Sequence, residues 1–135
     1  MTQPARILIV EDEMLVATEM EAILEDLGHA PVGIAPDLET AMQLADRSID
    51  LALVDLNLRD GLTGPEIGRL LCEKCNITVL FVTANPGLLG TGIAGTVGVL
   101  AKPTSEADVK RAVDYALRVR HGERVTPPAG LRAFG

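Results

Sequence analysis

The chain has almost no aromatic residues, and this scarcity limits what its core can be. Its 135 residues include one tyrosine, two phenylalanines and no tryptophan. Hydrophobic residues still make up 47% of the sequence, so a core must be packed from aliphatic side chains. Domains of ~150 residues bury roughly 70% of their unfolded surface, which makes this length sufficient for one core. We therefore expect a single domain and no second one.

Basic charge and long apolar runs are also scarce. The formal net charge is −7, and nucleic acids and anionic membrane surfaces both attract basic rather than acidic proteins. No apolar run approaches the ~18 residues of a membrane span, and no basic stretch at the amino terminus leads into a signal-peptide core. We expect a cytoplasmic protein without nucleic-acid or membrane partners, whose acidic body attracts a cation.

Cysteine is limited to Cys72 and Cys75, which form a C-x-x-C pair. A zinc site needs a second pair of ligands, and the remaining candidates, His29 and His121, are scattered along the chain. The pair closes a predicted helix, where the helix dipole opposes a reactive thiolate. We expect Cys72 to belong to the core and Cys75 to the helix end.

Apolar runs and amphipathic stretches alternate along the chain. The runs predict strands at 7–10, 29–35, 49–54, 77–82 and 97–101, and the stretches between them predict helices at 14–27, 37–47, from 65 and at 106–120. Glycines between 85 and 98 allow only a short or mobile fourth helix. This order predicts an α/β fold, a doubly wound, flavodoxin-like, five-stranded parallel sheet of order 2-1-3-4-5 with helices on both faces. Residues 1–121 form this domain, and 122–135 are expected to be a flexible tail.

Polar residues follow four of the predicted strands at the point where each strand ends: Asp12, Asp55, Thr83 and Lys102. The carboxyl ends of parallel strands share one edge of a sheet, so these side chains should meet there. Together with Glu11, three carboxylates would then be close, and like charges ~4 Å apart repel by roughly 4 kcal/mol at an effective dielectric near 20. The site needs a cation, and oxygen ligands suit Mg²⁺.

A divalent ion, an ammonium and a hydroxyl around one carboxylate are suited to phosphoryl transfer. The cation and the ammonium neutralise charge on the phosphoryl oxygens, and the carboxylate can act as the nucleophile. Asp55 stands alone at its strand end and is the expected nucleophile. The acids after the first strand are better placed as metal ligands.

At these residues the chain resembles the receiver domain of two-component response regulators, over about residues 6–120 and in a stand-alone, single-domain form. The resemblance implies that Asp55 accepts phosphate from a sensor histidine kinase or a histidine phosphotransfer protein. It implies Mg²⁺ held by Asp12 directly, Glu11 through water, Asp55 and the backbone carbonyl of Asn57. The phosphoryl group would be held by Thr83, Ala84 and Lys102. The Lys102–Pro103 peptide bond would be cis, as is usual in this family.

In function, the resemblance implies a regulator that catalyses only its own phosphorylation and dephosphorylation and signals to an unknown downstream protein. The sequence also leaves open whether the chain forms a homodimer. Val99 stands where receivers usually carry a tyrosine or phenylalanine that changes rotamer, so signal transmission needs another route. This departure favours the alternative of a phosphorylation-independent adaptor, while the retained pocket groups oppose it. An aspartate-nucleophile phosphatase would need an acid where Asn57 stands.

Apart from Cys75, no ionisable side chain lies between Lys74 and Lys102. One interpretation is two buried strands joined by a poor helix. The other is a partly apolar docking surface, because exposed apolar patches mark contact sites for partners. The residues expected on that surface are Leu88, Leu89 and Ile93.

Overall fold

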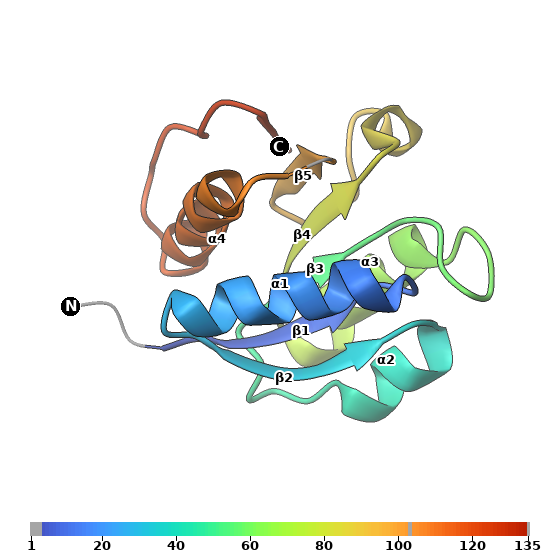
Figure 1. Ribbon diagram of the computed structural model, residues 1–135. Helices are drawn as coiled ribbons and strands as arrows, with labels where there is room; N and C mark the ends of the chain where they lie inside the picture. Colours follow the sequence, from blue (N-terminus) through green and yellow to red (C-terminus); the bar gives the residue numbers. More distant parts are fainter. Residues whose placement is uncertain (1–3, 103, 135) are drawn as a thin grey trace.

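The computed structural model describes residues 4–102 and 104–134 and places one six-stranded sheet at the centre of the molecule (Figure 1). The order of the strands is β2-β1-β3-β4-β5-β6. Their bounds are β1 (Arg6–Val10), β2 (Ala30–Ala35), β3 (Leu51–Val54), β4 (Thr78–Thr83), β5 (Gly98–Ala101) and β6 (Leu131–Ala133).

The first five strands pair in parallel in the order 2-1-3-4-5, which confirms the predicted fold. Pro31 lies in β2, at the edge of the sheet, where its missing N–H costs no inner ladder bond. Every inner strand is nearly free of polar side chains because helices cover both faces of the sheet.

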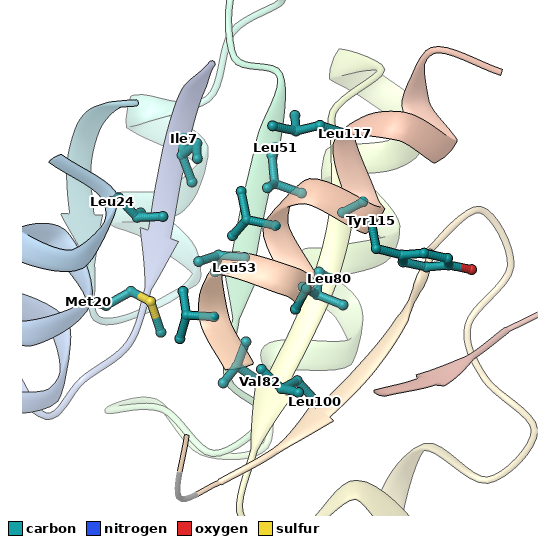
Figure 2. Packing of buried hydrophobic residues seen from close by; sticks show 14 of the residues in the cluster. Ile7, Met20, Leu24, Leu51, Leu53, Leu80, Val82, Leu100, Tyr115 and Leu117 are labelled. Atoms are coloured by element: carbon teal, nitrogen blue, oxygen red, sulfur yellow. The ribbon is translucent and has the colours of Figure 1, made fainter. Parts of the chain in front are cut away.

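The helices lie in two layers, with α1 and α4 against one face and α2 and α3 against the other (Figure 1). Their bounds are α1 (Met14–Asp26), α2 (Leu38–Leu44), α3 (Gly64–Cys75) and α4 (Glu106–Arg120). Successive side chains of a strand point to opposite faces of the sheet, so each strand contributes to both cores. In β1, Ile7 and Ile9 point to the α1–α4 side, and Leu8 and Val10 point to the α2–α3 side. Figure 2 shows the first of these cores, which is built almost entirely of aliphatic side chains.

Two helix starts follow directly from the sequence. Asp37 caps α2 by accepting a hydrogen bond from the Thr40 N–H at 2.8 Å. Ser105 caps α4 and forms a reciprocal pair with Asp108, which satisfies two N–H groups of the first turn. This cap fixes the point at which the chain leaves β5 and turns back over the sheet.

The segment between β4 and β5 forms only a 3₁₀ turn, η1 (Pro86–Leu89). Gly90, Gly92 and Gly95 follow with positive φ angles, which no right-handed helix contains. The expected short fourth helix is therefore present only as a single 3₁₀ turn.

The end of the chain differs from the expectation of a flexible tail. Residues 131–133 form β6, which pairs antiparallel with β5, and Leu131 is buried in the α1–α4 core. Periodicity does not reveal this strand because it is only three residues long and is held by contacts with residues far away in the chain.

Within residues 4–102 and 104–134, no helix is both long and apolar enough to cross a bilayer. The cysteines of the C-x-x-C pair are free thiols, both partly buried. The Cys72 thiol donates to the Gly95 carbonyl at 3.3 Å, and burial raises the pKa of Cys72 to about 11. A thiolate is thus disfavoured at neutral pH, as expected for a packing role.

Candidate functional site

The candidate site lies at the carboxyl edge of the sheet because four neighbouring strands end there in register. Val10 of β1 pairs with Val54 of β3, Val54 pairs with Phe81 of β4, and Thr83 at the end of β4 pairs with Ala101 of β5. The residue that follows each of β1, β3 and β5 is therefore carried to the same edge. These residues are Glu11, Asp55 and Lys102.

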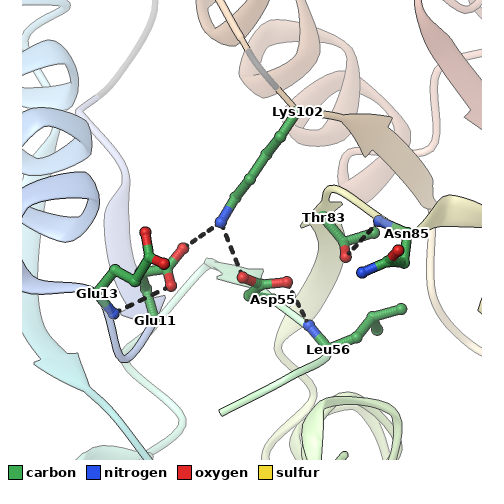
Figure 3. A network of polar contacts seen from close by, with 7 residues as sticks. All are labelled: Glu11, Glu13, Asp55, Leu56, Thr83, Asn85 and Lys102. Carbon is green, nitrogen blue, oxygen red and sulfur yellow. Dashed lines mark hydrogen bonds and ion pairs between the residues drawn. The ribbon is translucent and has the colours of Figure 1, made fainter.

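Lys102 joins the two carboxylates. Its Nζ lies 2.5 Å from Glu11 Oε1 and 2.8 Å from Asp55 Oδ2 (Figure 3). The exposed fractions of the three side chains are 21% for Lys102, 6% for Glu11 and 13% for Asp55. The result is a largely buried triad with one positive and two negative groups, assembled from the ends of three strands.

The surroundings of the triad shift two ionisation equilibria. Burial raises the pKa of Glu11, and this outweighs the lowering effect of its bonds from Lys102 and from the Glu13 N–H. Burial alone would lower the pKa of Lys102, but its bonds to the Asp55 and Glu11 carboxylates outweigh burial and raise it. The ammonium is therefore held charged beside Asp55.

Asp55 is oriented by its backbone as well as by Lys102. Its own N–H donates to the Val10 carbonyl at 2.9 Å, which continues the β1–β3 ladder by one residue. Its Oδ1 accepts from the Leu56 N–H at 2.7 Å, while Oδ2 faces Lys102 (Figure 3). Both carboxylate oxygens are thus fixed at the edge of the sheet.

Thr83 is buried, with 1% of its surface exposed, at the end of β4. Its Oγ1 accepts a hydrogen bond from the Asn85 N–H at 3.1 Å, so the hydroxyl supports the start of the η1 segment (Figure 3). Ala84, the next residue, is exposed and lines the same cavity as Asp55 and Lys102. The end of β4 therefore brings Thr83, Ala84 and Asn85 to the same edge of the sheet as the triad.

A cavity of about 380 Å³ extends from the triad between α1 and the sheet. Glu11, Asp55 and Lys102 line its polar part, and Val16, Ala17 and Met20 of α1 line much of the rest. The Asp55 carboxylate thus borders an open space rather than solid core.

The expected cluster of three carboxylates is only partly present. Asp12 follows Glu11 and is partly exposed, and Asn57 lies exposed in the loop after β3. Among the residues that the structure describes, no three His, Cys, Asp or Glu side chains are arranged to hold a metal ion. The ammonium of Lys102 lies between Glu11 and Asp55 and provides the positive charge that their repulsion requires.

Three other predictions concern Pro103, Val99 and the apolar docking surface. The expected cis bond involves Pro103, which lies outside the described residues. Val99 is buried in β5, with 1% of its surface exposed. Leu88 is 57% exposed, but Leu89 is only 5% exposed and packs with Ile93 against the core on the α2–α3 side. The prediction that Leu89 belongs to an exposed docking surface is therefore wrong, because the 3₁₀ turn points its side chain inward.

Sequence reasoning missed Gly64, the first residue of α3. A Cβ at this position would lie 2.1 Å from the Asp55 carbonyl oxygen and 2.5 Å from the Leu56 Cα. The Gly64 N–H also donates to the Leu56 carbonyl at 3.0 Å. Gly64 thus lets the start of α3 pack directly on the backbone that carries Asp55. The only signal was a glycine before Pro65.

We expect Gly64→Ala to destabilise the fold by about 1–3 kcal/mol, because the added methyl group must displace backbone rather than a flexible side chain. Chemical denaturation measures the change in the free energy of unfolding. Gly87→Ala is the matched control, since a Cβ there meets no atom within 4 Å. Equal stability of the two variants would contradict the close packing of α3 on Asp55.

The fold and its edge pocket define the class: a doubly wound α/β domain with an acidic, lysine-containing site at the carboxyl ends of its strands. Residues 7–114 match the family model of the response regulator receiver domain, and the chain belongs to this family. This confirms the resemblance seen in the sequence.

Comparisons with individual proteins agree with this assignment. The chain is 36% identical to the phyllosphere-induced regulator PhyR of Methylorubrum extorquens over 121 residues, which cover 87% of this chain and 45% of that protein. The receiver domain of Erythrobacter litoralis PhyR superposes with a TM-score of 0.78 at 26% identity, covering 91% of this chain and 97% of that one. The anti-anti-sigma factor PhyR from Bartonella quintana superposes with a TM-score of 0.75 at 28% identity. The match covers 90% of this chain and 50% of that one. The chain spans about half the length of the curated relatives it matches.

Proposed function

We propose that the chain accepts a phosphoryl group on Asp55 from a phosphohistidine of a sensor histidine kinase or a histidine phosphotransfer protein. The observation that carries the proposal is the bond from the partly buried Lys102 ammonium to the Asp55 carboxylate. An ammonium held charged beside a carboxylate at the border of a cavity is placed to neutralise charge on an incoming phosphoryl group. Membership of the receiver family supports the same reaction.

In the proposed reaction an Asp55 oxygen attacks phosphorus in line with the scissile P–N bond. The P–O bond forms, the P–N bond breaks, and its electron pair returns to the imidazole of the donor, which is protonated as it leaves. Lys102 then pairs with a phosphoryl oxygen, and the Thr83 hydroxyl and the Ala84 N–H donate to others. The product is an aspartyl phosphate.

The donor set at the edge fits Mg²⁺, because the side chains and carbonyl available there are hard oxygen ligands. Glu11, Asp12, Asp55 and the Asn57 carbonyl would hold the ion. Bound there, it would supply a divalent charge that neutralises the phosphoryl oxygens. Glu11 is also a partner of Lys102, so metal and ammonium would share the charge of this carboxylate.

The chain then signals through protein contacts rather than by turnover of a substrate. Its family consists of response regulators, and its relatives are described as a regulator and an anti-anti-sigma factor. The downstream partner is accordingly a protein. Leu88, the exposed apolar residue of η1, is the member of the expected docking surface that remains available for such a contact.

We expect incubation with acetyl phosphate and Mg²⁺ to add the mass of one phosphoryl group to the intact protein. The same incubation with a chelator should give no adduct, because the acidic edge then lacks its divalent charge. Intact mass spectrometry measures both. A chain that stays unmodified in Mg²⁺, or is modified equally without it, would show that the proposed reaction does not occur.

A phosphorylation-independent adaptor remains the second candidate, favoured by Val99. A buried valine cannot exchange between inward and outward rotamers as the usual aromatic residue does. The same experiment separates the two candidates, since an adaptor with a silent site gains no phosphoryl group.

A further inference from the structure

The C-terminal strand β6 occupies a site for which the rest of the chain makes room. A Cβ on Gly98 of β5 would lie 2.6 Å from the Arg132 carbonyl oxygen, and one on Gly92 would lie 2.6 Å from the Phe134 ring. Two glycines of the segment 85–98 therefore give β6 and the residue after it space to approach. We call the surface formed by β5 and residues 86–97 the seat of β6.

Specific bonds hold the strand in this seat. The Arg132 guanidinium donates to the Gly90 carbonyl at 2.7 Å and to the Pro86 carbonyl at 3.0 Å. It also lies 5.2 Å from the centre of the Phe134 ring. The Phe134 N–H donates to the Val97 carbonyl at 2.9 Å. One arginine thus ties the end of the chain to the η1 turn.

The η1 turn is in turn tied to the phosphoacceptor edge. The Asn85 N–H donates to the Thr83 hydroxyl oxygen at 3.1 Å, and Pro86, the next residue, supplies one of the two carbonyls that Arg132 binds. The backbone N–H of Lys102 donates to the Thr83 carbonyl at 2.8 Å. Thr83 is therefore bonded directly to the residue whose ammonium contacts Asp55. Thr83 therefore lies between the triad and the residues that hold β6.

We propose that β6 is a releasable strap: a phosphoryl group on Asp55 draws the Thr83 hydroxyl away from Asn85, frees residues 131–134, and exposes the β5 edge as an interaction surface. The inference rests on the proposed phosphorylation of Asp55. Once Asn85 and Pro86 move, the two carbonyls no longer match the planar guanidinium of Arg132. The remaining contacts of β6 are its three pairs with β5 and the buried Leu131, and a strand this short at a sheet edge can open locally.

The strap also provides a route for the signal that does not use Val99. Arg132 is the cross-strand partner of Val99 on β6. Its side chain reaches the η1 turn from the neighbouring strand, while Val99 stays buried. The exposed edge would present unpaired backbone groups of β5 to an extended segment of the same kind as residues 131–134.

Hydrogen exchange of the full chain, followed by NMR with and without Mg²⁺ and beryllofluoride, tests the strap. We expect the Phe134 amide to exchange at least about tenfold faster in the loaded protein, because its bond to Val97 opens. Arg132→Ala should exchange fast without loading. Arg124→Ala, which changes an exposed arginine earlier in the tail, should behave as the wild type.

A labelled peptide with the sequence of residues 128–134 probes the seat directly. Binding to the loaded wild type and to unloaded Arg132→Ala, but not to the unloaded wild type, supports an edge that becomes accessible. No binding to the loaded protein overturns the assignment of the β5 edge as an interaction surface.

Phosphorylation is measured separately by intact mass after acetyl phosphate treatment. If the adduct forms while Phe134 exchange stays unchanged on loading, the strap is wrong and the proposed function stands. If no adduct forms, the proposed function is wrong and the strap fails with it.

Discussion

Asp55→Asn is expected to abolish formation of the phosphoryl adduct while leaving the fold intact. The amide oxygen of asparagine is a far weaker nucleophile than a carboxylate, so the P–O bond cannot form. Asparagine keeps an acceptor for the Leu56 N–H, and Lys102 keeps its bond to Glu11. Intact mass after acetyl phosphate treatment in Mg²⁺ should therefore show no detectable adduct, and thermal unfolding should remain cooperative.

Asp114→Asn provides the matched control. Asp114 lies on α4 and its side chain is 51% exposed. Within the described residues, its one salt bridge is with Arg118. Removing its charge changes the net charge of the protein by the same amount as Asp55→Asn does. It should be phosphorylated like the wild type. An adduct on the Asp55→Asn protein would place the phosphoacceptor elsewhere and contradict the proposed chemistry.

The part of the site that the sequence predicted is the part fixed by strand ends. Asp55 and Lys102 are 47 positions apart and Glu11 and Lys102 are 91 apart, yet each follows an apolar run. Parallel pairing converts that local signal into proximity, because all the strands end at one edge. The strand order and the contact of Lys102 with Asp55 were predictable for this reason.

The remaining features depend on side-chain geometry that no periodicity encodes. Leu88 and Leu89 are adjacent and identical, and only the 3₁₀ turn decides that one is exposed and the other buried. The strand β6 depends on Gly92 and Gly98; their pattern predicts only a short or mobile fourth helix, and in the structure they also make room for distant residues. Likewise, the sequence showed that a cation was required but not that Lys102 itself would lie between two carboxylates.

Lys102→Met should destabilise the protein by roughly 3–5 kcal/mol at pH 7, because it leaves the buried Glu11 carboxylate without its cation. Methionine preserves most of the apolar length of the lysine side chain, so the loss reports charge rather than packing. Chemical denaturation gives the free energy of unfolding. Lys110→Met, at an exposed position of α4, is the control and should change stability little.

The pH dependence of this loss has a definite sign. Burial already raises the pKa of Glu11 above its ordinary value of 4.5, and removing the Lys102 bonds, which lower it, raises it further. A carboxyl with a raised pKa favours the fold in its protonated form, so stability falls as the pH rises from 4.5 through the pKa in the folded state. The gap between Lys102→Met and the wild type should therefore be small in acid and widen toward neutral pH.

Addition of Mg²⁺ provides the decisive comparison. If Glu11, Asp12 and Asp55 hold the ion, bound metal replaces the missing ammonium, and Mg²⁺ stabilises Lys102→Met more than it stabilises the wild type. Lys110→Met should respond to Mg²⁺ as the wild type does. An equal response of all three proteins would mean that the ion does not share the charge of Glu11 with Lys102, and would contradict the proposed metal site even where the acid pocket itself is intact.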